Sequence, residues 1–140
     1  MANYIPDSSS ATKPLPEISE EALPFWQGAL DHRLMMQRCS QCGKYQWFPT
    51  AMCRFCQSDR MAWEEADGDG VVYSYTVTHR GSVAAFKTPY VIAIVELPNG
   101  VRLMSNIVEC SPDAVKVGMP VKVCFEDWTP EVSIMQFRPA

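Results

Sequence analysis

Four cysteines in two Cys-x-x-Cys pairs constrain the fold of this chain more than any other feature. Cys39 and Cys42 form the first pair, Cys53 and Cys56 form the second, and ten residues separate the two pairs. A two-residue spacer lets one tight turn direct both sulfurs of a pair toward a single ion, and a hairpin brings the pairs together. Four thiolates complete a tetrahedral Zn²⁺ shell without an open position. The sequence therefore predicts a structural zinc ribbon.

The residues after each pair refine this prediction. Gly43 follows the first pair, where a zinc knuckle needs a residue that tolerates a positive φ angle. The second pair is followed by Gln57 and lacks that glycine. Two disulfides or four unrelated buried thiols are the alternative interpretation, and four thiolates can also hold iron in a rubredoxin-like redox site. Purified protein without colour would exclude the iron.

The length of 140 residues limits the chain to at most two small modules, and 47% hydrophobic residues suffice for a core. The longest apolar run, Tyr90 to Val95, is too short to span a bilayer. We see no signal peptide at the N-terminus, and thiolate ligands require reducing conditions, so a cytoplasmic location is expected. Cys110 and Cys124, the two remaining cysteines, are expected to be small buried hydrophobic residues.

Charge is distributed unevenly along the chain. The net charge of −4 argues against a general nucleic-acid binder. Five basic residues and one acidic residue lie between His32 and Arg60, whereas eight acidic and six basic residues follow from Asp67 onward. The zinc segment is thus a basic part of an acidic protein, where a small anion can dock. Alternatively, a module with a small core simply uses these charges for solvation.

The N-terminal region divides into a tail and a helix. Residues 1–18 are rich in serine and proline and are predicted to be a flexible tail. A helix is predicted over Glu20 to His32, with Ser19 as its N-cap and a regular part that begins near Pro24. Its apolar face either packs on the body of the same protein or serves as a docking surface for a partner.

The rest of the sequence predicts a mainly β fold of two modules. Three short strands, within 34–38, 45–48 and 61–63, form the ribbon. Beyond Gly70, five strands are predicted over residues 71–78, 90–97, 101–108, 121–126 and 133–138, with one helical turn from Ser111 before the fourth. Five antiparallel strands in this arrangement suit a closed Greek-key barrel of the OB-fold type. The expected domains are the tail (1–18), the helix with the zinc ribbon (19–66) and the OB-fold domain (67–140).

Several short motifs in this order resemble a family catalogued as domain of unknown function thirty-five (DUF35). The resemblance covers Leu23 to the C-terminus and rests on Leu23–Gly28, Gln37–Lys44, Phe48-Pro49, Gly68–His79, Pro89–Val91 and Val117–Val123. It implies a non-catalytic accessory subunit of a thiolase-fold enzyme, such as a thiolase, a thiolase-like aldolase or a related acyltransferase. Some members of the family are fused to or paired with a hot-dog-fold acyl-CoA hydratase, but no segment here is long enough to be one.

In such assemblies the ribbon and barrel line part of the coenzyme A channel or hold the catalytic subunit in shape. With that implication, basic and aromatic residues near the knuckles become candidate coenzyme A ligands. Arg38, Lys44 and Arg54 are expected to meet the phosphates. Phe55 or Trp47 is expected to stack on the adenine ring.

A stable hetero-oligomer with the thiolase-fold enzyme is expected, with the helix at or near the junction. Phe25, Trp26 and Leu30 are predicted to form an apolar face that is too large for a small ribbon to cover easily. An exposed apolar area beside a charged rim is typical of a subunit interface.

No catalytic residues are predicted, because no Ser, Cys or Lys stands in a recognisable nucleophile setting. His32 suits the end of the helix, and His79 suits a loop at the barrel rim, where it either binds a phosphate or is a satisfied loop residue. We expect no turnover by the chain alone, and the resemblance implies that it is a required subunit of a complex that forms or cleaves carbon–carbon bonds of acyl-CoA. The alternative function is a single-stranded nucleic-acid-binding module, with Tyr73 and Tyr75 as stacking residues.

Overall fold

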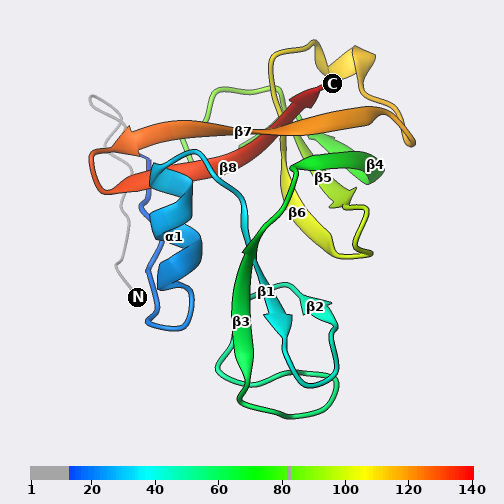
Figure 1. The fold of residues 1–140 in the computed structure, drawn as a ribbon. Coiled ribbons are helices and arrows are strands. Elements are labelled where there is room, and N and C mark those ends of the chain that lie inside the picture. Colours follow the sequence, from blue (N-terminus) through cyan, green and yellow to red (C-terminus); the bar gives the residue numbers. More distant parts are fainter. Residues whose placement is uncertain (1–12, 82) are drawn as a thin grey trace.

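The computed structural model describes residues 13–81 and 83–140 and consists of a small sheet, a helix and a barrel (Figure 1). Most of the predicted tail lies outside the described residues, and residues 13–18 form neither helix nor strand. Within the described ranges, no helix is long and apolar enough to cross a membrane.

The N-terminal half holds the helix and the three-stranded sheet. Helix α1 spans Leu23–Leu30, and strands β1 (Met35–Cys39), β2 (Tyr45–Gln46) and β3 (Met61–Glu65) form an antiparallel sheet in the order β2-β1-β3. The helix is shorter than predicted. The Ser19 hydroxyl accepts a hydrogen bond from Ala22 N at 3.3 Å, which caps a turn before the helix, and Ala22 is the N-cap residue without a side-chain cap.

The C-terminal half consists of the strands β4 (Asp69–Thr78), β5 (Tyr90–Glu96), β6 (Arg102–Ile107), β7 (Pro120–Thr129) and β8 (Val132–Pro139). They form a closed barrel in the order β4-β5-β6-β8-β7. A short 3₁₀ helix (Pro112–Ala114) precedes β7, the fourth of these strands along the chain, as predicted, and Ser111 caps it. This arrangement confirms the predicted fold class.

One pairing differs from the prediction of an all-antiparallel barrel. Strands β6 and β8 are parallel, with Ile107 opposite Phe137. An odd number of strands cannot alternate in direction all the way around a closed ring, so at least one neighbouring pair must run the same way. In this barrel the parallel pair is the seam between β6 and β8.

The ribbon and the barrel share one hydrophobic core. Val95 and Phe137 from the barrel pack in the same cluster as Leu34, Met36 and Phe25 from the ribbon and helix. Helix α1 lies against β8 and β1, and Figure 1 shows it beside the barrel. The apolar face of the helix therefore packs largely on the body of the same protein, which is the first of the two alternatives that the sequence left open.

Candidate metal centre and a basic cleft beside it

The four cysteines of the two pairs lie together with the geometry of a metal site. Their Sγ atoms all lie within 4.8 Å of one another. The Cys39 and Cys56 sulfurs are 3.6 Å apart, as are those of Cys42 and Cys53. Zn–S bonds of about 2.3 Å in a tetrahedron place the sulfurs about 3.8 Å apart, whereas a disulfide needs about 2.05 Å. The cluster therefore fits a structural zinc ion and not two disulfides.

Both knuckles have the same backbone geometry, although only one has the glycine. Gly43 has a φ of 78°, as predicted, and Gln57 has a φ of 63° at the corresponding place. Gly43 N donates to Cys39 O at 2.8 Å, and Gln57 N donates to Cys53 O at 2.9 Å. The missing glycine therefore changes the residue but not the turn.

Backbone amides direct their N–H groups at the buried sulfurs. Cys42 N lies 3.4 Å from Cys39 Sγ, and Phe55 N lies 3.4 Å from Cys53 Sγ. The N–H of Cys42 lowers the pKa of the Cys39 thiol to about 6. Although the N–H of Ser58 opposes the change, burial and the neighbouring thiols raise the pKa of Cys56 to about 11. Four thiolate charges within 4.8 Å of one another repel each other. A divalent zinc ion offsets this repulsion and stabilises the deprotonated form of all four cysteines.

Two buried glutamines hold the loop that carries the second pair, and the sequence analysis missed them. Gln46 Nε2 donates to Gln37 Oε1 at 2.8 Å, and Gln46 Oε1 accepts from Arg54 N at 3.0 Å. Gln37 Nε2 donates to Thr50 O at 2.8 Å. Gln37 and Gln46 are opposite each other on β1 and β2. Their presence as polar residues within two predicted strands of the ribbon is the sequence signal that could have identified them.

We expect Gln46→Ala to destabilise the ribbon by about 2 to 3 kcal/mol, because it removes the hydrogen bond to Gln37 and leaves the N–H of Arg54 without its acceptor. Zinc transfer to a chromogenic chelator should become correspondingly faster. Gln41→Ala is the matched control, since Gln41 is an exposed glutamine in the same ribbon. Equal rates of zinc transfer for the two variants would contradict this role of Gln46.

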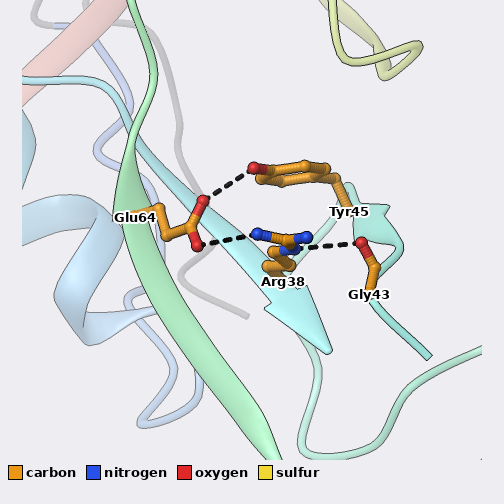
Figure 2. A network of polar contacts seen from close by, with 4 residues as sticks. All are labelled: Arg38, Gly43, Tyr45 and Glu64. Carbon is orange, nitrogen blue, oxygen red and sulfur yellow. Dashed lines mark hydrogen bonds and ion pairs between the residues drawn. The ribbon is translucent and has the colours of Figure 1, made fainter. Parts of the chain in front are cut away.

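Arg38 is engaged within the ribbon (Figure 2). Arg38 Nη1 donates to Glu64 Oε1 at 3.2 Å, and Arg38 Nε donates to Gly43 O at 3.0 Å. Tyr45 Oη donates to the other oxygen of Glu64 at 2.7 Å, and Tyr45 and Arg38 together lower the pKa of that carboxyl. Arg38 thus joins β1 to β3 and to the first knuckle, an arrangement that leaves it little freedom to act as the predicted phosphate ligand.

A cleft of about 480 Å³ between the ribbon and the barrel brings together the other four predicted coenzyme A ligands. Lys44, Trp47, Arg54 and Phe55 line it. Lys44 Nζ lies 4.8 Å from the centre of the Phe55 ring. Among the described residues, neither Lys44 nor Arg54 forms an ion pair with a carboxylate.

The barrel adds a basic residue to this cleft that the sequence analysis did not identify. Arg102, at the start of β6, lines the cleft opposite the ribbon. Its Nε donates to Glu96 at 2.7 Å, and its guanidinium lies 3.9 Å from the centre of the Tyr73 ring. Only the packing of the barrel against the ribbon places Arg102 near Lys44, so no local motif could have revealed it.

The three residues of the predicted partner interface do not form one exposed face. Phe25 is only 2% exposed and packs edge-on against Trp26 and Trp47, with ring centres 5.1 and 4.9 Å away. Trp26 is half-buried, whereas Leu30 is exposed. The prediction that Phe25 is available to a partner is wrong for this chain, because the barrel and ribbon together bury it. More exposed apolar side chains, Phe48, Met52 and Phe55, lie in the ribbon loops.

Comparison with family models matches both halves of the chain. Residues 26–62 match the rubredoxin-like zinc ribbon domain of ChsH2, and residues 63–126 match its C-terminal OB-fold domain. A curated relative from Thermomonospora curvata, named as a probable enoyl-CoA hydratase alpha subunit, is 39% identical over 93% of this chain. The chain spans only 41% of that relative's length.

Two further proteins match over most of their own length. A DUF35 domain-containing scaffold protein from Methanothermobacter thermautotrophicus is 35% identical over 67% of this chain and 72% of the relative. A solved structure described as the Ltp2-ChsH2(DUF35) aldolase contains a chain that is 38% identical, with a TM-score of 0.82. That match covers 89% of this chain and 98% of the other.

Proposed function

This chain belongs to the DUF35 family of zinc-ribbon and OB-fold proteins, and on that basis we propose that it is a non-catalytic accessory subunit of an acyl-CoA-processing enzyme. One observation carries the proposal. The chain matches nearly the full length of the DUF35 chain in an aldolase structure, at a TM-score of 0.82. The names of other relatives, a hydratase alpha subunit and a scaffold protein, point to the same kind of role.

We further propose that the partner is a thiolase-fold enzyme that forms or cleaves carbon–carbon bonds. A closed four-sulfur zinc site supports the assignment of catalysis to the partner, because the zinc offers no open coordination position for a substrate. The zinc instead fixes the ribbon loops, which present Met52 and Phe55 to solvent. Exposed apolar side chains on a rigid module are suited to burial against a second protein.

Affinity purification of the tagged chain from its own cells, followed by identification of the bound protein, tests this proposal. We expect a stoichiometric complex with a thiolase-fold enzyme and acyl-CoA turnover by the reconstituted complex. The chain alone should give no thiolysis, hydration or retro-aldol cleavage. Turnover by the chain free of partner, or a partner that does not process acyl-CoA, would contradict the proposal.

The cleft between ribbon and barrel is the proposed contact with coenzyme A. Lys44 and Arg54 supply positive charge that no described carboxylate neutralises, and Phe55 and Trp47 supply aromatic surface. Coenzyme A carries a diphosphate, a further phosphate and a flat adenine, so cations next to aromatic rings match its chemistry. Arg102 lines the cleft from the barrel side, where Glu96 pairs with its charge.

In the complex, Arg54→Ala is expected to raise KM for the acyl-CoA substrate about fivefold while kcat and assembly stay unchanged, because an exposed charge contact contributes about 1 kcal/mol. An acyl-pantetheine substrate, which lacks the phosphates and the adenine, should not respond to the substitution. Arg60→Ala is the matched control, since Arg60 is an exposed arginine of the same ribbon outside the cleft lining. A similar rise in KM with Arg60→Ala would contradict the proposal that coenzyme A binds in the cleft.

A further inference from the structure

A second cleft, of about 570 Å³, lies on the barrel away from the ribbon. Residues of β5, β6 and β8 line it, together with the segment 85–87 before β5 and the end of β7. Ile92 on β5 pairs with Asn106 on β6, and both alternate with residues that point into the buried core. The cleft therefore opens on the outer face of the sheet, and the buried residues Ser105, Ile107 and Met135 also line it.

The parallel seam between β6 and β8 helps to form this cleft. Among the described residues, these two strands pair at a single position, where Ile107 lies opposite Phe137. Farther along the seam, the hydroxyl of Ser105 donates to Met135 O at 2.9 Å, so a side-chain contact replaces backbone pairing there. Residues of both strands on either side of this contact line the cleft.

The walls of the cleft are apolar over most of its length. Met104 on β6, which is 65% exposed, lines the cleft together with Ile92 on β5 and Ile134 on β8. One end is aromatic, where the Phe86 ring centre lies 6.2 Å from that of Tyr90 and 5.9 Å from that of Trp128. Exposed apolar area of this kind is costly in water unless a ligand or partner covers it.

The two cations in the lining differ in how they are paired. Lys13 Nζ lies 2.9 Å from Glu126 Oε1 and 5.0 Å from the centre of the Trp128 ring, so its charge is neutralised. Lys87 is exposed and forms no ion pair with another residue in the described ranges. Because Lys87 adjoins Phe86, this uncompensated positive charge lies at the aromatic end of the apolar cleft.

We propose that this barrel cleft binds an elongated apolar molecule with one carboxylate, of the fatty-acid type. The carboxylate pairs with Lys87, and the hydrocarbon chain covers Ile92, Met104 and Ile134. The volume falls in the range of about 300–1,000 Å³ that is typical of small-molecule sites. A single uncompensated cation matches one anionic group, whereas a nucleic acid strand requires a basic groove that follows its phosphates. This cleft shares no lining residue with the proposed coenzyme A cleft.

Titration of the zinc-loaded full chain with the fluorescent fatty acid cis-parinaric acid tests this site. We expect saturable one-site binding with a rise in fluorescence. Met104→Asp should weaken it about tenfold or more, because the ligand then meets a desolvated charge. Val117→Asp is the matched control, since Val117 is 67% exposed and lies outside the cleft lining.

Lys87→Glu tests the proposed carboxylate contact separately. It should weaken competition by dodecanoate about threefold or more and leave competition by dodecanol, which carries no charge, unchanged. Absence of saturable binding by the parent chain overturns the proposal, as does an equal loss in the Met104→Asp and Val117→Asp variants. Equal effects of Lys87→Glu on dodecanoate and dodecanol would overturn the assignment of the carboxylate to Lys87.

Discussion

Replacing Cys39 with serine is expected to abolish stoichiometric zinc binding and to unfold the ribbon. Cys39 is fully buried, and its sulfur lies 3.6 Å from that of Cys56. Structural zinc contributes about 10–16 kcal/mol of apparent binding free energy to small domains, which is more than a three-stranded ribbon gains from its own packing. Metal analysis should fall from one zinc per chain to well under half.

The barrel is expected to persist in this variant, because most of its core residues lie within its own strands. Leu34 and Met36, however, join the ribbon to that core, so the barrel should lose some of its stability against urea. Far-UV circular dichroism should retain a β signal while proteases cleave the ribbon. Cys124→Ser is the control, because Cys124 lies in β7 outside the cluster. Full zinc content after Cys39→Ser would contradict the four-sulfur site.

The parts of this protein that could be predicted from sequence are those whose physical cause is local. The spacing of Cys39 and Cys42 determines a knuckle on its own, and Gly43 supplies the conformation next to it. The start of the 3₁₀ helix is likewise local, because Ser111 caps it and Pro112 occupies its first position. A nearly continuous run of apolar, β-branched residues such as that of β5 identifies a strand without knowledge of its neighbours.

What could not be predicted depends on contacts between residues far apart in the chain. The sequence does not reveal that Arg38 is paired, because its partner, Glu64, lies on another strand. It does not reveal that Phe25 is buried, because the residues that cover it, such as Trp47, come from elsewhere in the ribbon. Arg102 joins the basic cleft only through the packing of barrel on ribbon. Burial and charge pairing are therefore tertiary properties, and one sequence without its fold does not reveal them.

The junction between ribbon and barrel gives the second large effect, since Gly68→Ala is expected to destabilise the protein by about 2–5 kcal/mol. Gly68 lies between β3 and β4 with a φ of 81°, and its carbonyl accepts a hydrogen bond from Val123 N at 2.8 Å. A Cβ at this position would collide with the side chain of Val123. A positive φ costs about 1–2 kcal/mol for a residue with a Cβ, and overpacking adds about 1–3 kcal/mol.

Two further variants separate these contributions in chemical denaturation. Gly118 has a φ of 86° and open space around it, so Gly118→Ala should show the backbone cost alone, about 1–2 kcal/mol. Val123→Ala combined with Gly68→Ala should recover part of the loss relative to the sum of the single changes, because it removes the atoms with which the new Cβ collides. If Gly68→Ala and Gly118→Ala have equal effects and the double variant shows no coupling, then the close approach of Gly68 to β7 does not limit stability at the junction.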